Sequence, residues 1–468
     1  MTSTENRALP VLLAGAFMVV LDFFIVNVAL PSIAASLGAG ESSLEWVVAG
    51  YGLSFAAFLI TAGRLGDALG RRRVYAIGLG LFTVASAACG LAPSPTTLVI
   101  ARIAQGVAGA IVMPQVLAII GVTYRGPAYV RALSLYGVVA GLAAVGGQLI
   151  GGALVESGLG WRACFLINVP VGIAALALTP RLVPESRAER RVKLDVPGTG
   201  WLVLALVAVL LPLIEGRQLG WPAWTWACLA VAPVLGALFV RRQRGVGDPL
   251  LPLTLFNSRG FSAGLATQLF LASAQAAFFV YLALYLQGGR GLSALDSGLV
   301  FTILAVAYVV CSFPAPALTE RLGRVVIAVG GVALTAGLLV LAFEVADIGT
   351  RGSLLALVPG LLLVGAGIGL CYTPLTSVVL ATVKPELAGG ASGAMATTQQ
   401  IGYALGVAIT GIIFFGTRDI ASAFEVSLIQ LAGVAAATVL ASRALPSITR
   451  PGRGEVVRPS ATVQEWSS

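Results

Sequence analysis

The sequence predicts an all-helical integral membrane protein that crosses the bilayer many times. Of its 468 residues, 58% are hydrophobic and only 10% are charged, whereas a soluble domain carries about 25% charged residues. Apolar runs of about 20 residues recur along the whole chain, and each is long enough to cross the hydrocarbon core as a helix. So few charged residues cannot cover a water-soluble globule.

Fourteen apolar spans are expected, separated by turn-rich segments such as "LAPSPTT" and "ESGLGW". An even number places both termini on one side. Most of the 29 Lys and Arg residues lie in the loops and tails of that side, which the positive-inside rule makes cytoplasmic. The first span is longer than the apolar core of a signal peptide, so we expect it to stay in the mature chain. The expected spans are 9–30, 45–62, 73–92, 96–119, 131–155, 162–179, 196–215, 222–240, 261–286, 293–315, 325–344, 353–377, 388–415 and 423–441.

Two segments of the chain repeat each other and divide it into halves. The loop "GRLGDALGRRRV" (63–74) follows the second span, and "PALTERLGRV" (316–325) follows the tenth. We therefore expect six-helix bundles at 1–179 and 261–441, two inserted spans at 180–260 and a disordered cytoplasmic tail at 442–468. Internal repeats of this kind are typical of secondary transporters that bind their substrate between the halves.

The repeated loops are expected to act as a conformational latch on the cytoplasmic face. Glycines allow a tight reversal and close helix approach, and a carboxylate can pair with a nearby arginine or cap a helix. The alternative is an ordinary basic loop that only orients the protein. The latch residues are Gly63, Asp67, Gly70, Arg71, Glu320 and Arg324.

Several motifs resemble the major facilitator superfamily, and within it the fourteen-span drug:proton antiporters. "GRLGDALGRRRV" is similar to the superfamily's signature between helices 2 and 3. "LDFFIVNVALP" (21–31) is similar to the fourteen-span family's first-helix signature, with Phe24 in place of its threonine. "IARIAQGVAGA" (100–110) and "WRACFLINVPVG" (161–172) resemble further family patterns. The resemblance implies a monomeric exporter in the plasma membrane with a major-facilitator fold of two bundles plus two extra helices. The many alanines and glycines of the chain suggest a bacterial source.

One departure lies in the fifth span. The antiporter signature there has a Gly-Pro pair, but this chain reads "AAVGGQLIGG" (143–152), with Gln148 in place of the proline. The loss of a helix-kinking proline weakens the inference of antiport. Glycines that remain are expected to permit close helix packing. They are Gly147, Gly151 and Gly152 in this span, and Gly106 in the fourth span is expected to act in the same way.

Two opposite charges lie inside the predicted spans at similar depth. Asp22 is the only ionised side chain in its apolar run and lies about 13 Å inside the end of its helix. Arg102 lies about 10 Å inside the fourth span from the same side. Intramembrane charges are costly and usually functional, so we expect Asp22 to carry the proton, paired with Arg102 and in competition with substrate. The alternative is a static pair that joins two helices.

Other residues within the spans are candidates for a substrate cavity. Interhelical hydrogen bonds explain each polar one equally well. Glu45 begins the second span. The plainer interpretation is a solvated residue at the start of a helix. The alternative is an acidic group that attracts cations. The candidates are Asn27, Phe24, Glu45, Tyr51, Gln148, Gln268, Gln275, Tyr281, Gln399 and Gln400.

These observations favour an exporter of small hydrophobic or cationic compounds, driven by the proton gradient. The chain has no histidine and no nucleotide-binding "GxxxxGK[ST]", and its five cysteines are too isolated for a metal or disulfide framework. We expect no cofactor, no nucleic-acid partner and no enzymatic activity. A symporter or facilitator on the same fold is the alternative, and a polytopic membrane enzyme is a remote one.

Overall fold

The protein is described here from a computed structural model over residues 5–187, 194–384 and 387–446. Every regular element in these ranges is helical. The first group is α1 (Glu5–Leu37), α2 (Glu41–Leu69), α3 (Arg71–Gly90), α4 (Pro95–Thr123), α5 (Pro127–Val155), α6 (Arg162–Leu166) and α7 (Asn168–Leu182). A pair follows, α8 (Val196–Glu215) and α9 (Ala223–Gly245). The last group is η1 (Leu253–Asn257), α10 (Arg259–Leu284), η2 (Tyr285–Gly289), α11 (Ala294–Ser312), α12 (Ala315–Leu322), α13 (Val325–Ile348), η3 (Leu354–Leu357), α14 (Val358–Leu380), α15 (Ala388–Phe414) and α16 (Ile420–Ser442).

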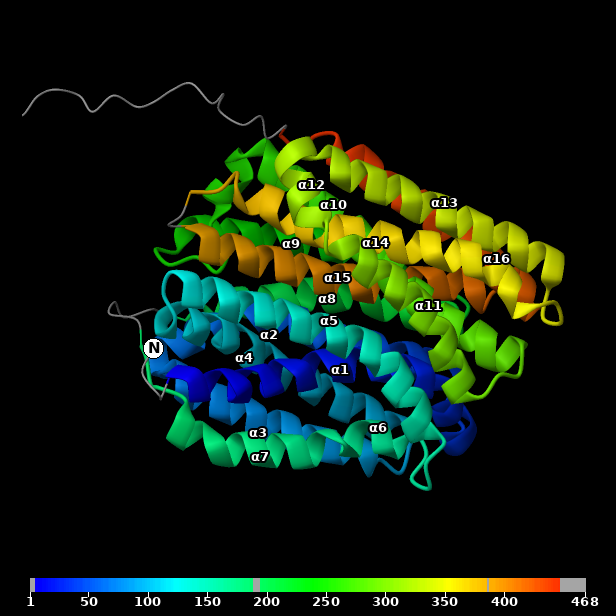
Figure 1. The fold of residues 1–468 in the computed structure, drawn as a ribbon, viewed down its shortest axis with the longest axis horizontal. Helices are drawn as coiled ribbons and strands as arrows, with labels where there is room; N and C mark the ends of the chain where they lie inside the picture. The colour runs from blue at the N-terminus through cyan, green and yellow to red at the C-terminus, as the bar shows by residue number, and fades with distance from the viewer. Residues whose placement is uncertain (1–4, 188–193, 385–386, 447–468) are drawn as a thin grey trace, which may run out of the picture.

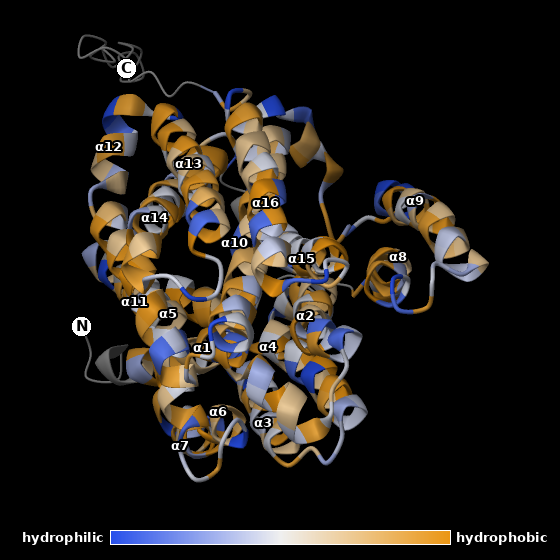
Figure 2. Ribbon diagram, turned by 90° about the vertical axis from the view of Figure 1, so that its right-hand side faces the viewer, coloured by the Kyte–Doolittle hydropathy of each residue, from blue (hydrophilic) through white to orange (hydrophobic). Residues whose placement is uncertain are grey.

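The helices form two bundles with a pair of helices at one side. Helices α1 to α7 pack together, as do α10 to α16, and the long axes of the two bundles run side by side (Figure 1). Among the described residues, the pair α8 and α9 packs mainly on itself and meets the bundles chiefly at α2 and α15. Figure 2 shows this pair standing apart from the rest, with hydrophobic residues on its outer surface.

Asp195 stabilises the start of the inserted pair. Its carboxylate caps α8 by accepting a hydrogen bond from the Gly198 amide, and it accepts others from Arg242 Nε at 2.7 Å and Gln243 Nε2 at 2.9 Å. A capped helix end with satisfied amides is more stable than an open one. These contacts hold α8 against α9 at the end of the molecule where α1 begins and α16 ends.

Thirteen helices among the described residues are long and apolar enough to cross a membrane. The predicted span 388–415 forms α15, which is not one of the thirteen, so the count of fourteen stays a prediction. The predicted span 293–315 ends earlier, because α12 is a separate short helix that carries part of the repeated loop. The predicted tail lies, from residue 447 on, outside the described residues. The sequence also gave no signal for the π-helical turn η2.

The two bundles make several contacts at the distal end, which is the end opposite the start of α1. There the Leu295 amide of α11 donates to Glu156 at the end of α5, at 2.9 Å. Gln287 Nε2 donates to the carbonyl of Val28 on α1, also at 2.9 Å. Gly152 is packed so tightly that an added Cβ would lie 2.5 Å from the Ala294 carbonyl oxygen. The distal end between the bundles is therefore closed.

Candidate functional site: a central cavity and a buried ion pair

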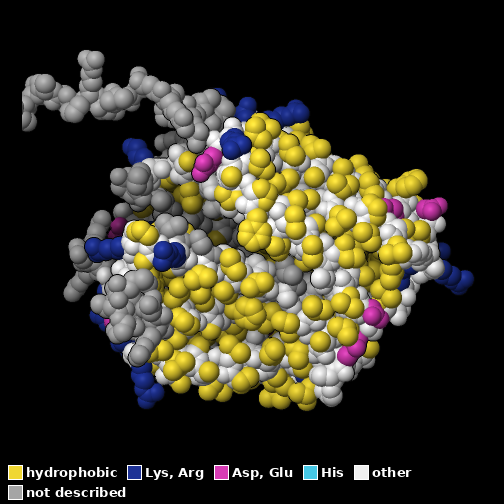
Figure 3. Space-filling model, viewed as in Figure 1, with side chains coloured by type: hydrophobic (Ala, Val, Ile, Leu, Met, Phe, Trp, Pro, Cys, Tyr) yellow, Lys and Arg dark blue, Asp and Glu magenta, His cyan; other side chains and the backbone are white. Residues whose placement is uncertain are grey.

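A cavity of about 370 Å³ lies between the two bundles. Its wall is built from α1, α2, α4 and α5 of the first bundle and from α10, α11, α14 and α15 of the second. A hollow is visible between the two lobes toward the left of Figure 3, on the side of the termini. Because the distal end is closed, this cavity has the position that a rocking two-bundle protein gives to its binding site.

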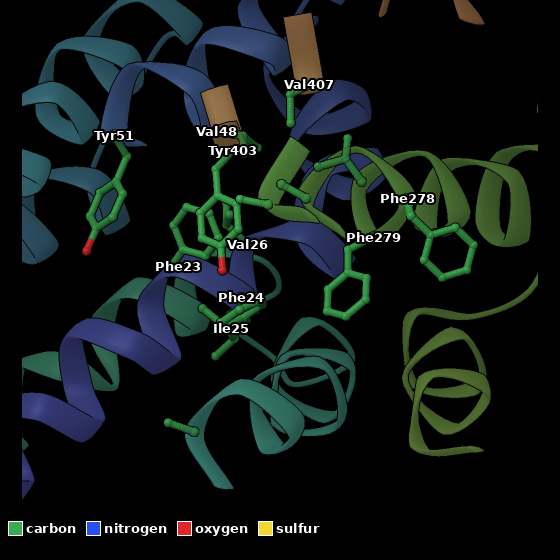
Figure 4. Close-up of a cluster of buried hydrophobic side chains, with 14 of the residues drawn as sticks. Phe23, Phe24, Ile25, Val26, Val48, Tyr51, Phe278, Phe279, Tyr403 and Val407 are labelled. Carbon is green, nitrogen blue, oxygen red and sulfur yellow. The ribbon is translucent and has the colours of Figure 1, made fainter. Parts of the chain in front are cut away.

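Aromatic rings from both bundles meet at the cavity. Phe23 of α1 stacks on Tyr403 of α15 with ring centroids 4.8 Å apart and an interplanar angle of 25°. Figure 4 shows these two rings face to face, with Phe24 and Phe279 beside them. Stacked and edge-on rings add about 0.5–1.5 kcal/mol per pair beyond their burial. The Phe23–Tyr403 contact therefore joins the halves at the cavity itself.

Polar groups on the second bundle's side of the cavity are mostly satisfied by one another. Tyr372 donates to Gln275 Oε1 at 2.5 Å, and Gln399 Nε2 donates to the Tyr403 hydroxyl at 2.9 Å. Linked hydrogen bonds of this kind fix side-chain positions and rigidify a wall. This part of the cavity is therefore preformed.

The buried ion pair lies inside the first bundle. Asp22 and Arg102 are both fully buried, and Arg102 Nη1 lies 2.5 Å from Asp22 Oδ2. Gln105 Nε2 and Asn168 Nδ2 each donate to Asp22 Oδ1 at 2.8 Å. Ser86 Oγ accepts hydrogen bonds from both of these amides. The carboxylate is thus held by three donors, as a buried charge requires.

Arg102 has further contacts that tie the ion pair to the cavity wall. Its Nε donates to the Val47 carbonyl at 3.0 Å, and its guanidinium lies 4.2 Å from the centroid of the Tyr51 ring. Tyr51 itself lines the cavity, and its hydroxyl donates to the Val19 carbonyl of α1 at 3.3 Å. Nη2 of Arg102 is buried with no hydrogen-bond partner. One aromatic ring therefore separates the cavity from the ion pair.

The expected contact between Asp22 and Arg102 is present, but Asp22 is not among the cavity-lining residues. It lies one residue from Phe23, which does line the cavity, and points into its own bundle toward α4 and α7. Direct competition between proton and substrate for one site, as expected from the sequence, does not fit this geometry. The geometry offers two adjoining sites instead.

The structure brings six of the ten predicted cavity residues together at the cavity wall. These are Phe24, Tyr51, Gln148, Gln275, Gln399 and Gln400. The other four lie off the wall: Asn27, Glu45, Gln268 and Tyr281.

Glu45 departs most from its plainer interpretation as a solvated residue. It lies within α2 and is only 4% exposed, because α15 packs on that face of the helix. An added Cβ on Gly411 of α15 would meet both Glu45 and the Tyr281 hydroxyl. Tyr281 donates that hydroxyl to the Val407 carbonyl of α15 at 2.8 Å. Both side chains therefore belong to the contact between the bundles rather than to the cavity.

Arg71 and Arg324 of the two repeated loops make their side-chain contacts within their own bundles. Arg71 pairs with Asp67 one helical turn away, with Nη2 to Oδ1 at 2.7 Å. Gly70 has φ of 107°, a conformation that an L side chain rarely adopts. In the second bundle Arg324 donates to the carbonyls of Arg443 and Leu445. Gly63 lies on α2 and Glu320 on α12. The latch role of these residues stays a prediction.

The predicted packing glycines lie at close helix contacts. An added Cβ on Gly106 would lie 2.4 Å from the Tyr51 carbonyl oxygen, and one on Gly151 would lie 2.9 Å from the Ile25 carbonyl oxygen. Gly147 faces Phe24 at 3.0 Å, and Gly152 faces α11. These glycines let α4 and α5 approach α2, α1 and α11 closely, as small residues do in membrane helices.

Sequence reasoning missed several residues of both sites. Gln105 lies one turn after Arg102 on the same helix face, and Asn168 is polar within an apolar run, so both carried a signal. Tyr372 and Tyr403 line the cavity. No feature of the sequence distinguishes them from aromatic residues that face lipid.

A two-bundle arrangement of membrane-length helices around a central cavity defines the class of membrane transporters. A family model described as the Major Facilitator Superfamily matches residues 12–407. The chain belongs to this superfamily, and it is a transporter rather than an enzyme.

Curated relatives and a solved structure agree with this assignment. The chain is 36% identical over 417 residues to a protein named "Probable actinorhodin transporter" from Streptomyces coelicolor, covering 87% of this chain and 72% of the relative. It is 39% identical over 402 residues to "Multidrug resistance protein Stp" from Mycobacterium tuberculosis, covering 85% and 74%. A crystal structure of a POT family transporter in complex with 5-aminolevulinic acid shares the fold, with a TM-score of 0.70 and 14% identity over 93% of this chain and 95% of that one.

Proposed function

We propose that this transporter exports hydrophobic or amphipathic drugs or antibiotics across the bacterial cell membrane in exchange for protons. The observation that carries the proposal is the aromatic cavity between the bundles, separated from a buried carboxylate–guanidinium pair by a single tyrosine ring. Relatives named for antibiotic transport and multidrug resistance supply the substrate class. The energy source is the proton gradient, with no cofactor.

Alternating access follows from the way the bundles contact each other. In the described state the distal end is closed by the α5–α11 contact and by Gln287 on Val28. With both termini cytoplasmic, the distal end is extracellular and the cavity belongs to the inward-facing state. Rocking of one bundle on the other separates the distal contacts and closes the cytoplasmic side. The transporter works as a monomer with fourteen spans, because each chain supplies both halves of the cavity.

Asp22 is the proton-carrying group in this proposal, and Arg102 is its partner. A carboxylate in the membrane interior loses the favourable hydration of its charge, while the guanidinium beside it stabilises that charge. Any movement that lengthens the Asp22–Arg102 contact favours the protonated carboxyl. Substrate pressed against Tyr51 disturbs the ring that covers the guanidinium. Proton and substrate are thus coupled through Tyr51 rather than by sharing one site.

A symporter or facilitator on the same fold is the second candidate, and Gln148 in place of the antiporter proline favours it. Efflux of Nile red and ethidium from an efflux-deficient host separates the two. An antiporter lowers accumulation of at least one dye, and a protonophore abolishes the effect. The same cells with an Asp22→Asn variant are the control for leakage. Dye movement down its own gradient that ignores the protonophore would refute exchange and support the facilitator.

A further inference from the structure

The cavity wall carries no charged side chain among the described residues that line it. Its polar members are amides, hydroxyls and backbone groups of both bundles. The carboxylate of Asp22, next to the lining residue Phe23 in the chain, is already neutralised by Arg102 at 2.5 Å and is not part of the wall. A cation that left water for this cavity would lose its hydration and find no carboxylate in the wall in exchange. The wall therefore favours an uncharged ligand.

Aromatic rings do not restore a site for a cation. Ten of the 25 lining residues are Phe or Tyr, and none is Trp, the strongest cation–π partner. The face of Tyr51 is already occupied by the Arg102 guanidinium at 4.2 Å. The remaining rings, such as Phe23 stacked on Tyr403, present flat apolar faces from both bundles. Such faces suit a planar ring system that stacks or packs edge-on.

Gln148 is a lining residue whose side-chain amide lacks partners on both its nitrogen and its oxygen. It is 2% exposed, and both its Nε2 and its Oε1 are buried without a hydrogen-bond partner. A buried amide left unpaired costs roughly 1–3 kcal/mol per group. Gln400 Oε1, across the cavity on α15, is also buried and unpartnered. In contrast, Gln275 and Gln399 are bonded to wall tyrosines. The unsatisfied amide thus points to a group that arrives with the ligand.

The position of Gln148 also matches a ligand-contacting role. It lies on α5 twelve residues beyond Tyr136, another lining residue, so the wall extends about 18 Å along this helix. Its neighbour Gly147 packs on Phe24, which fixes the backbone beside the cavity. The Gln148 carbonyl faces Gly298 of α11, where the two bundles close. A ligand bound to Gln148 therefore lies against the contact that must open for export.

We propose that the cavity binds an uncharged planar aromatic molecule through Gln148. The amide Nε2 donates to a carbonyl of the ligand, and Oε1 accepts from an adjacent N–H or O–H. The ring system lies among the phenylalanines and tyrosines of the two bundles. This inference rests on the proposed export function, whose substrate class it narrows from amphipathic compounds in general to neutral, flat hydrogen-bonding ones.

Two probes of one ring system test the inference. Phenanthridinone is a flat three-ring lactam without charge whose N–H and C=O lie side by side, and N-methylphenanthridinium is a cation of the same size. Equilibrium dialysis against the purified full-length protein in detergent, with empty micelles as the blank, gives both affinities in the absence of any proton gradient. We expect the lactam to bind at least about tenfold more tightly than the cation, because the wall offers amides and no carboxylate.

The variant Gln148→Leu keeps the size of the side chain and removes both amide atoms. We expect it to weaken lactam binding about tenfold, the effect of losing two neutral hydrogen bonds, and to leave the weak binding of the cation unchanged. Gln268→Leu is the matched control, because Gln268 is a buried glutamine of α10 outside the cavity wall. It also reports whether a buried leucine at such a position disturbs folding.

Three results would overturn the inference: tighter or equal binding of the cation, equal lactam binding by Gln148→Leu and the parent protein, or no binding of either probe. These outcomes are distinct from failure of the export proposal. Dye efflux that ignores the proton gradient, together with Gln148-dependent lactam binding, would refute exchange and leave the ligand class standing. Gradient-dependent efflux without lactam binding would support exchange and refute the proposed ligand class.

Discussion

The Asp22→Asn variant tests whether the buried ion pair only joins helices or also carries the proton. Asparagine has nearly the same shape as aspartate, and its oxygen can still accept hydrogen bonds from Gln105 and Asn168. The change leaves the Arg102 guanidinium fully buried without its counter-charge. Breaking a buried pair in this way costs about 3–5 kcal/mol. We expect a marked fall in the apparent melting temperature of the purified protein.

A double variant separates stability from coupling. In Asp22→Asn with Arg102→Gln, neither charge remains, so no uncompensated ion is buried and most of the lost stability returns. The hydrogen-bonding partners Gln105, Asn168 and the Val47 carbonyl remain. If Asp22 carries the proton, the double variant is stable but releases no protons when dye is added to everted vesicles. Intrinsic tryptophan fluorescence and a pH-sensitive dye measure the two quantities in one preparation.

Two outcomes would refute the reasoning about this pair. Dye-driven proton release by the stable double variant would show that Asp22 has a structural role alone. An unchanged melting temperature for the single variant would show that the pair contributes little to the fold, contrary to its complete burial.

Three further predictions concern the helix contacts. Gly152→Ala places a Cβ 2.5 Å from backbone of α11, so we expect the distal end to open, seen as a longer spin-label distance between α5 and α11. Gly158→Ala, which meets nothing within 4 Å, should leave that distance unchanged. Gly106→Ala should destabilise the α2–α4 contact by about 1–3 kcal/mol. Gly121→Ala, on the same helix but with open space around it, should not destabilise the protein. Equal melting temperatures of the two variants would contradict this prediction. Hydrogen bonds from Ser293 and the Leu295 amide lower the pKa of Glu156. The closed distal contact is therefore favoured while this carboxylate is ionised. The contact weakens as the pH falls through the lowered pKa. Glu156→Gln should remove that pH dependence from the same spin-label distance, and a persistent dependence would exclude Glu156 as its source.

The ion pair could be predicted from the sequence because the depth of a residue in a membrane helix follows from its position along that helix. A membrane helix rises 1.5 Å per residue, so the depths of Asp22 and Arg102 follow from their distance to the ends of their spans. A charge at that depth needs a partner, and only one opposite charge lies at a similar depth. The additional donors Gln105 and Asn168 were harder to assign, because many polar residues in a membrane helix can bond to any neighbour.

The position of Glu45 could not be predicted, because burial there depends on elements far away in the sequence. The start of a span is normally hydrated, and negative charge suits a helix start. In the structure α15, more than 300 residues later, covers this face of α2. No periodicity within α2 reports which helices of the second bundle will pack on it.

The glutamines of α10 show the same limit for the cavity. Gln268 and Gln275 are seven residues apart, so helical periodicity places them on one face of the helix. They differ by about 10 Å in depth, and only Gln275 reaches the cavity. The length of a cavity along a helix is set by where opposing helices converge, which residue spacing within one helix does not encode. Sequence alone could therefore select the correct face but not the correct turn.

A cavity without charge and a carboxylate outside it are compatible with coupled exchange, because coupling requires linked affinities rather than a shared site. If protonation of Asp22 changes the affinity for substrate, substrate must change the proton affinity of Asp22 by the same factor. The element that can carry this linkage has to contact both sites and move with the bundles. Tyr51 contacts both sites, since its ring lines the cavity and covers the Arg102 guanidinium, and its hydroxyl joins α2 to the backbone of α1. The two-site geometry thus allows a neutral substrate to be exchanged for a proton. Competition for a single carboxylate would allow such exchange only for cationic substrates.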